Sequence, residues 1–419
     1  MLQNRLCAIS AIAALTLLSN CSAGQTVGHE LFGLNGNASA PGTVKSTFGY
    51  AVADEPQAAL VGRAILNNGG NAVDAAVAEG FAQAVTLPSR GGLGGGGACL
   101  IEMPDAEGVM QAPIVLNFPA GAPAATGGSR PAAVPMLARG LLAMQARYGS
   151  LPQQSVIVPA ERLARSAEVS QALESDLLVV GDALLADPQA ASIYAPDGHL
   201  LPVGALFHQP NLVTTLENLR VNGVSGLYTG SYAAQFAQAA DAAGGGLTAQ
   251  DLISAVPQYS APTLSQQNGY DVASLPATPV DASTALPASA SFMALDKNGG
   301  AVICVTSMNN LFGTGRFAPD TGVLLAASPR TNPAAQLAGA IAYSGQSHKF
   351  RAAVAGTGQN QAQTAAQIGL QNALTGTNAP IPQPGRADII SCPGGVPGGE
   401  ASCSASISAG GDGLAIGGR

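Results

Sequence analysis

Two short apolar runs, residues 292–295 and 301–305, flank the dipeptide Asn298-Gly299. An Asn-Gly dipeptide between apolar runs is a strong signal for a β-hairpin. The pattern therefore predicts two antiparallel strands here, and the rest of the chain can be placed around them.

The register of this hairpin decides which polar residues meet at its open end. A two-residue turn would set Ser289 opposite Met308, whereas a three-residue loop with Gly299 left-handed would set it opposite Ser307. In both registers Ser289 lies beside Ser307 and Asn309. A hydroxyl at the start of a buried strand with such neighbours is a candidate nucleophile, although serines at strand ends more often only satisfy backbone groups.

Helical patterns dominate the part of the chain before residue 262. Residues 58–67, preceded by Pro56, predict a helix that ends at glycines 69–70, and Asn71 caps a second helix with Asp74 in its first turn. Thr248 and Asp251 have the spacing of a capping box. Further helices are expected over 131–148, 159–173, 176–185, 209–219 and 232–243.

Strand patterns follow in the second half. Residues 262–287 show little regular structure, and beyond the hairpin we expect strands at 322–327, 340–344 and 350–354 and a helix at 362–374. A strand is also expected at 98–101. Helices packed around antiparallel strands predict an α+β layered sandwich.

The glycine run GGLGGGG at 91–97 matches a dinucleotide-binding search string. A true fingerprint follows a strand and opens a helix, but here a helix precedes the run and a strand follows it. We therefore reject cofactor binding and expect close backbone approaches at these glycines.

The first 23 residues predict an export signal. One positive charge at Arg5 precedes an apolar run at 6–18, which is too short to span a membrane. The signal could be processed in two ways. One is ordinary cleavage after Ala23, and the other is lipidation of Cys21, because residues 18–21 resemble a lipobox. The protein is then expected in the periplasm or envelope of a bacterium, with a polar linker over 24–44.

The charge and cysteine content of the chain argue against nucleic-acid binding and against a zinc site. Only 10% of the 419 residues are charged and the net charge is −8, so no basic surface for nucleic acid is expected. Cys99 and Cys304 lie in apolar runs and are expected to be unpaired buried thiols. Cys392 and Cys403 could close a small loop by a disulfide. No Cys or His pair has zinc-ligand spacing, and no metal site is predicted.

Ordered sequence motifs resemble those of the gamma-glutamyltranspeptidase family, also called gamma-glutamyltransferases or glutathione hydrolases. They are ILNNGGNAVDAAVA at 65–78, LP at 87–88, GGLGGGGACLI at 91–101, VP at 134–135, RYGSLP at 147–152, QPNL at 209–212, TLE at 215–217, YTG at 228–230, GLTAQDL at 246–252, Asp296, FGTG at 312–315 and TGVLL at 321–325.

The resemblance implies an αββα four-layer sandwich and an N-terminal nucleophile hydrolase without metal or organic cofactor. Family members cut themselves before a threonine, whose freed α-amine serves as the base for its own hydroxyl. The nucleophile position falls on Ser289, a supporting hydroxyl on Ser307 and a substrate-binding amide on Asn309. Residues 45–288 would form the large fragment and 289–419, with a Gly/Pro-rich tail, the small fragment that stays associated with it.

Several positions depart from the family pattern. Pro119 stands near the place of the arginine that clamps the substrate carboxylate, and Arg330 lies where an acidic residue holds the substrate amine. Ala335-Gln336 stands where the family has the serine pair that supports the oxyanion hole. The glycine-rich oxyanion loop that follows in the family is reduced here to residues 356–358. A long helical segment that the family has before the nucleophile is almost wholly absent. A shift of two residues would put Ser291 at the nucleophile position.

Three hypotheses follow from the sequence. In the first the protein is a self-cleaving hydrolase of gamma-glutamyl amides, in the second it is a catalytically inactive scaffold or binding protein of the envelope, and in the third it is an amidase in which Arg330 recognises an acidic acyl group. The first predicts two fragments with gamma-glutamyl-anilide turnover, the second one intact chain, and the third two fragments that act on other amides.

Overall fold

The computed structural model describes residues 47–124, 127–277, 288–332, 334–408 and 412–418. The predicted export signal, Cys21 and the 24–44 linker lie outside the described residues. Within the described part, no helix combines the length and the apolar character needed to cross a membrane.

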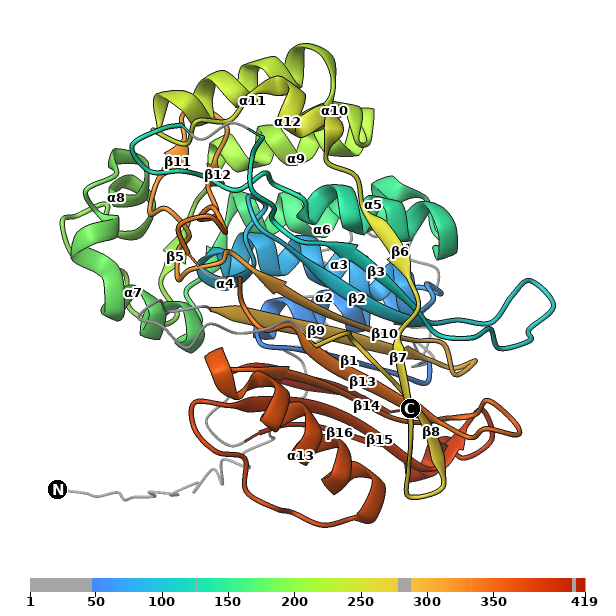
Figure 1. The fold of residues 1–419 in the computed structure, drawn as a ribbon. Helices are drawn as coiled ribbons and strands as arrows, with labels where there is room; N and C mark the ends of the chain where they lie inside the picture. Colours follow the sequence, from blue (N-terminus) through green and yellow to red (C-terminus); the bar gives the residue numbers. More distant parts are fainter. Residues whose placement is uncertain (1–46, 125–126, 278–287, 333, 409–411, 419) are drawn as a thin grey trace, which may run out of the picture.

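Two antiparallel sheets form the centre of the molecule (Figure 1). The seven-stranded sheet has the order β17-β1-β9-β10-β2-β3-β6, with β1 (Gly49–Ala53), β2 (Gly96–Glu102), β3 (Ile114–Phe118), β6 (Gln258–Ser260), β9 (Ser289–Asp296), β10 (Ala301–Ser307) and β17 (Leu414–Gly418). The six-stranded sheet has the order β16-β15-β14-β13-β8-β7, with β7 (Thr263–Gln267), β8 (Tyr270–Ser274), β13 (Ala338–Tyr343), β14 (Phe350–Thr357), β15 (Arg386–Val396) and β16 (Ser404–Ile407). Two small ladders join β4 (Ala167–Glu168) to β5 (Leu206–Phe207) and β11 (Phe317–Ala318) to β12 (Val323–Leu324).

Helices cover the outer faces of both sheets (Figure 1). On the seven-stranded side lie α2 (Pro56–Asn67), α3 (Ala72–Thr86), α4 (Pro88–Gly91), α5 (Leu137–Tyr148), α6 (Gln153–Arg165), α7 (Gln171–Leu184), α8 (Pro188–Tyr194), α9 (Pro210–Asn222), α10 (Ser225–Tyr228), α11 (Gly230–Ala242) and α12 (Ala249–Ser254). On the six-stranded side lies α13 (Ala362–Thr375), and the 3-10 helices are η1 (Gln359–Gln361) and η2 (Glu400–Ser402).

Three separate apolar cores confirm the predicted four layers. One core lies between the helices and the seven-stranded sheet and includes Phe81 and Phe292. A second lies between the two sheets and includes Met293 and Ile341. The third lies between the six-stranded sheet and α13 and includes Leu370. Each sheet thus buries both faces, which gives the αββα sandwich.

The glycine corner between α2 and α3 forms as the sequence predicts. Asn71 and Asp74 exchange two bonds of 2.9 Å, each side chain accepting from the other's backbone N–H. Asp74 also accepts hydrogen bonds from the backbone N–H groups of Ser150 and Leu151. One buried carboxylate therefore starts α3 and ties it to the turn after α5.

Some helix boundaries differ from the prediction. The helix expected at 131–148 begins only at Leu137, because 132–134 form isolated bridges instead. The helix expected from 159 begins at Gln153 and contains Pro159 inside it. The expected break near residue 175 is wrong, because the Ser170 hydroxyl caps α7 and places the break before it.

Two segments contain strands that the prediction did not include. Little regular structure was expected at 262–287, but β7 and β8 form a hairpin around Asn268-Gly269. Both turn residues have positive φ, 50° and 82°, as a type I′ turn requires. In the tail, β15 and β16 extend the six-stranded sheet and β17 extends the seven-stranded one.

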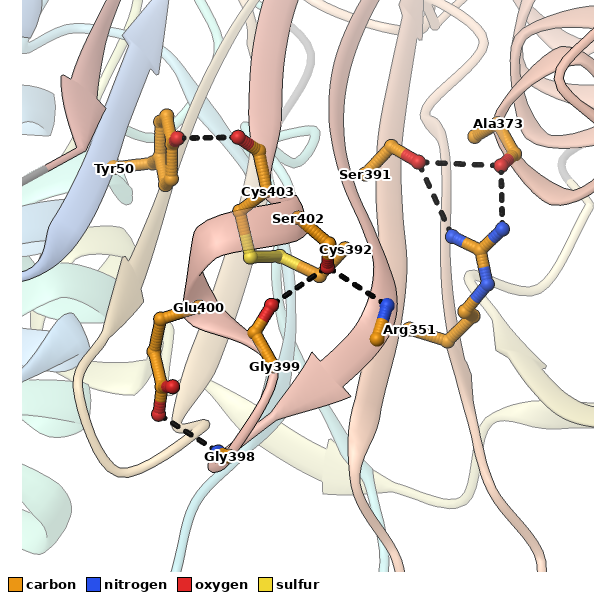
Figure 2. The surroundings of a disulfide bond; sticks show 11 residues. Tyr50, Arg351, Ala373, Ser391, Cys392, Gly398, Gly399, Glu400, Ser402 and Cys403 are labelled. Carbon is orange, nitrogen blue, oxygen red and sulfur yellow. Dashed lines mark hydrogen bonds between the residues drawn. A yellow bond between two sulfur atoms is a disulfide. The ribbon is translucent and has the colours of Figure 1, made fainter.

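The predicted Cys392–Cys403 disulfide is confirmed (Figure 2). It joins β15 to the residue before β16, and the Tyr50 hydroxyl donates to the carbonyl oxygen of Cys403 at 2.8 Å. This contact links the disulfide to β1 in the other sheet.

The expectation that Cys99 and Cys304 are unpaired thiols is wrong. They form a second disulfide with their Cα atoms 4.1 Å apart. The reason is the register of β2 with β10, which sets Cys99 directly opposite Cys304. Because the two cysteines are 205 residues apart in the sequence, no local pattern indicates that they pair.

Candidate active site

The β9–β10 hairpin adopts the three-residue loop of the two predicted alternatives. Gly299 has φ 87°, and the backbone N–H of Asp296 donates to the carbonyl oxygen of Gly300 at 2.9 Å. The ladder then sets Ser289 opposite Ser307. The prediction that these hydroxyls lie together is confirmed.

The side of β9 that carries Ser289 faces the six-stranded sheet. Phe292 belongs to the core under the helices, whereas Met293 belongs to the core between the sheets. Because side chains alternate along a strand, Ser289 and Ser291 lie on the same side as Met293. Both serines are buried, at 2% and 1% exposure.

Ser307 contacts the peptide bond that precedes Ser289. Its hydroxyl donates to the carbonyl oxygen of Ala288 at 2.7 Å, and it accepts a bond of 2.8 Å from the backbone N–H of Asn309. The second bond orients the hydroxyl, and the first polarises the carbonyl. Attack on the Ala288 carbonyl carbon would place negative charge on the carbonyl oxygen. A hydroxyl that donates to this oxygen is positioned to stabilise that charge.

The side chain of Asn309 connects three segments around the hairpin. Its Nδ2 donates to the carbonyl oxygens of Ala120 at 3.0 Å and Ala327 at 2.8 Å. Both amide hydrogens are therefore used within the protein, so Asn309 could contact a ligand only through Oδ1. Its role in substrate binding remains a prediction.

A pocket of about 160 Å³ opens beside Ser289. Arg90 and Asp176 line it from the helical side, Gly358 and Arg386 line it from the six-stranded sheet, and Ala288 lies in it next to Ser289. The pocket thus lies where both sheets and the helical layer meet at one end of β9.

Arg90 and Asp176 form a buried, bidentate ion pair in this pocket. Arg90 Nε and Nη2 donate to Asp176 Oδ2 and Oδ1 at 2.8 and 2.7 Å. The Ser89 hydroxyl adds a bond of 2.6 Å to Oδ2. Arg90 Nη1 is buried and has no hydrogen-bond partner among the described residues.

The short glycine segment at 356–358 reaches the same pocket. Gly358 has φ 102°, and a Cβ there would lie 2.1 Å from the carbonyl oxygen of Pro384, so only glycine fits. Ala335 and Gln336 do not line the pocket; the Gln336 side chain bonds to Gln363 at the start of α13.

Ser291 joins two carboxylates behind the pocket. Its Oγ lies 3.2 Å from Asp54 Oδ2 and 2.9 Å from Asp388 Oδ2. Burial raises the pKa of Asp388 well above its usual range, and the nearby charge of Asp54 raises it further. A protonated Asp388 can donate to Ser291, which can then donate to Asp54.

A larger cavity of about 900 Å³ lies at the opposite end of β9. It is lined by Asp296 and Asn298 of the hairpin and by Tyr148 and Arg147 at the end of α5. Among the described residues, no group of three or more His, Cys, Asp or Glu side chains could hold a metal ion.

Sequence reasoning found the hydroxyls but not the charged groups around them. Arg90 lies 86 residues from Asp176, and Arg386 comes from a tail in which no strand was expected. The sequence contains one usable signal, since Arg90 interrupts a buried, glycine-rich segment that has no other charge between Glu79 and Glu102.

Comparisons with known proteins identify relatives of this chain. The model of the family Gamma-glutamyltranspeptidase matches residues 58–286. The chain is 34% identical over 254 residues to the glutathione hydrolase proenzyme of Escherichia coli K12, covering 56% of this chain and 43% of that protein. It is 29% identical over 234 residues to the capsule biosynthesis protein CapD proenzyme of Bacillus anthracis, covering 55% and 42%. The aligned part is thus less than half the length of these relatives.

Solved structures show the same fold. The cephalosporin acylase from Bacillus halodurans superposes with a TM-score of 0.72 at 17% identity, over 91% of this chain and 99% of that one. The gamma-glutamyltranspeptidase of Helicobacter pylori superposes with a TM-score of 0.50 at 30% identity, over 57% and 72%. The fold of this chain therefore matches that of the cephalosporin acylase over nearly the full length of both chains. The family model covers more than half of the 419 residues. The chain belongs to the gamma-glutamyltranspeptidase family.

Proposed function

We propose that the protein cuts itself before Ser289 and that the freed Ser289 hydrolyses small gamma-glutamyl or related amides. The observation that carries the proposal is the 2.7 Å hydrogen bond from the Ser307 hydroxyl to the Ala288 carbonyl oxygen. Relatives described as glutathione hydrolase proenzymes support a precursor that matures by cleavage.

Self-cleavage would proceed by an N-to-O acyl shift. Ser289 Oγ attacks the Ala288 carbonyl carbon, and the negative charge that forms on the carbonyl oxygen is stabilised by Ser307. The bond from that carbon to the Ser289 nitrogen then breaks, and the proton lost by Oγ goes to the nitrogen. Water hydrolyses the resulting ester, which leaves a carboxylate on Ala288 and a free α-amine and hydroxyl on Ser289.

In turnover, the same hydroxyl would attack a substrate amide. The free α-amine of Ser289 takes the proton from Oγ and passes it to the leaving amine, so no histidine is needed. Water then hydrolyses the acyl ester, which releases the acid and restores the hydroxyl. Removal of Ala288 from the pocket makes room for the acyl group.

The test is the mass of the purified protein after reduction of its disulfides. We expect two fragments, the smaller beginning at Ser289, in the wild type and in Ser289→Thr, but one chain in Ser289→Ala. Reduction is essential, because Cys99 and Cys304 lie on opposite sides of the cleavage point and would keep the fragments joined. Without reductant, the same sample should show one mass.

The control is Ser291→Ala, which should still be cut before Ser289. A cut before Ser291, or a wild-type chain that stays whole on long incubation, would overturn the proposal. The processed protein should then release 4-nitroaniline from an acyl-anilide, and Ser289→Ala should not.

We also propose export to a bacterial periplasm or envelope, with Cys21 as an alternative lipid anchor. The apolar run at 6–18 supports this proposal, and so do two disulfides, which form in oxidising compartments. Recovery of the mature chain in the cytoplasm with reduced cysteines would contradict it.

A further inference from the structure

The charged groups of the Ser289 pocket point to the class of acyl group that the site takes. The inference rests on the proposed function, because it assumes that Ser289 is the nucleophile. Its starting point is that two guanidinium groups, Arg90 and Arg386, line one pocket of about 160 Å³.

Arg90 is fixed in position with donor capacity left over. The ion pair with Asp176 uses its Nε and Nη2, and both side chains are 7% exposed. Nη1 remains buried without a partner among the described residues. An unsatisfied buried donor on a permanently charged group is costly, and a bound anion would relieve that cost.

Arg386 approaches from the other sheet. It lies at the start of β15 and is partly exposed, its Nε is buried without a hydrogen-bond partner, and no ion pair joins it to a described acid. Burial raises the pKa of the nearby Asp388 well above its usual range, which disfavours the charged form of the carboxyl closest to Arg386 in the sequence. Arg386 thus has its charge and its donors available.

Among the described residues that line the pocket, no carboxylate is free to bind an ammonium group of a substrate. Asp176 is the acidic residue that lines it, and its two oxygens already accept three hydrogen bonds from Arg90 and Ser89. Arg330, the residue first expected to bind an acidic group, does not line the pocket. Its Nη2 donates to the carbonyl oxygens of Pro123 and Ala124.

We propose that Arg90 and Arg386 bind the terminal carboxylate of a short acyl group that carries no ammonium, so that the substrates are monoamides of small dicarboxylic acids. The pocket volume equals roughly five water molecules at about 30 Å³ each, which suits a chain of four or five carbons. A gamma-glutamyl group has the same chain and carboxylate but adds an ammonium that would lie beside two arginines.

The experiment compares three 4-nitroanilides on the processed protein: glutaryl, gamma-glutamyl and the neutral pentanoyl. We expect kcat/KM for glutaryl to exceed that for pentanoyl by about 100-fold and to exceed that for gamma-glutamyl as well. Arg386→Gln should lower the ratio of the glutaryl value to the pentanoyl value by about 100-fold, and Arg386→Lys should partly restore that ratio. Arg330→Gln is the matched control and should leave the glutaryl-to-pentanoyl ratio unchanged.

A second measurement separates this inference from the proposed function. Glutarate binding is followed by calorimetry on the wild type, Arg386→Gln and Ser289→Ala. Glutarate should bind the wild type and lose at least tenfold in affinity in Arg386→Gln, whether or not the anilides turn over. Turnover with equal rates on glutaryl and pentanoyl, a preference for gamma-glutamyl, or glutarate binding that Arg386→Gln does not weaken would each overturn the inference. A chain that stays uncut yet binds glutarate through Arg386 would overturn only the proposed cleavage.

Discussion

The two ends of strand β9 differ in whether the polar side chains around them have hydrogen-bond partners. At the hairpin end, Asp296 accepts hydrogen bonds from the backbone N–H groups of Ala72, Asn298 and Gly300, at 3.0, 2.8 and 3.0 Å. At the other end, beside Ser289, Arg90 Nη1 and Arg386 Nε have no hydrogen-bond partner in the part of the chain that the structure describes. The larger cavity lies at the satisfied end and the smaller pocket at the unsatisfied one.

This difference shows that cavity size alone is a poor guide to the site. A large pocket is the default place to look for binding. In this protein the 900 Å³ cavity is lined by a carboxylate whose hydrogen bonds hold a turn and a helix start together. The groups with spare charge and a polarised peptide bond are at the 160 Å³ pocket.

The largest effect is expected for Ser307→Ala, which removes the hydroxyl from the Ala288 carbonyl. Losing one donor to a developing oxyanion typically costs about 100- to 1000-fold in rate. Self-cleavage, followed by mass spectrometry over time, should slow by that factor. Ser307→Thr should keep most of the rate.

Thr306→Val is the matched control for Ser307→Ala. The Thr306 hydroxyl lies on the neighbouring residue but donates to the Ala290 carbonyl at 3.2 Å, away from the cleavage point. Equal slowing in both variants would mean that general damage to β10, and not the oxyanion contact, controls cleavage.

A smaller effect, on stability, is expected for Asp296→Ala. The change leaves three backbone N–H groups without their acceptor and should lower the free energy of unfolding by roughly 3 kcal/mol. Cleavage should continue, because seven strand steps of about 3.3 Å put Ser289 about 23 Å away. Urea unfolding and fragment masses measure the two outcomes, with exposed Lys297→Ala as the control. A variant that is folded but uncut would show that the two ends are coupled.

A pH-dependent effect is expected for Glu102, an exception at the hairpin end. Both of its carboxylate oxygens are buried without partners among the described residues, and burial raises its pKa to about 8. Below about pH 4.5 the group is protonated in both the folded and unfolded states. Between pH 4.5 and 8 the unfolded chain ionises first, so stability falls with pH by at most about 1.4 kcal/mol per unit.

Glu102→Gln should remove this part of the pH dependence. Its free energy of unfolding relative to the wild type should rise from pH 5 to pH 8 in urea titrations, while Glu107→Gln, on the surface, should show no such trend. Acyl-anilide turnover should not change. A loss of turnover in Glu102→Gln would assign chemistry to the hairpin end and weaken the contrast between the two ends.

Short-range chemistry explains what the sequence could predict. The Asn71–Asp74 and Thr248–Asp251 capping boxes and the Asn298-Gly299 loop each depend on residues within four positions of one another. Asn268-Gly269 carries the same kind of hairpin signal and marks β7 and β8, which the surrounding Pro- and Ser-rich composition obscured. The family motifs added the layer order and the position of Ser289.

Long-range pairing explains what the sequence could not predict. The Cys99–Cys304 disulfide depends on the order of strands in the sheet, and Ser291 meets Asp388 across 97 residues and two sheets. Arg90 and Arg386 line one pocket because α4 and the first residue of β15 lie at the same place in the fold. None of these contacts has a local pattern that would reveal it.

The position of β1 gives cleavage a topological consequence. β1 precedes the cleavage point, but β17 and β9, which pair with its two edges through five residues each, both follow it. After a cut before Ser289, a strand of one fragment would be held between two strands of the other, so the fragments could part only by unfolding the sheet. Refolding after denaturation and reduction would then require two molecules to meet, and its yield should depend on concentration, whereas the uncut precursor would refold at any dilution.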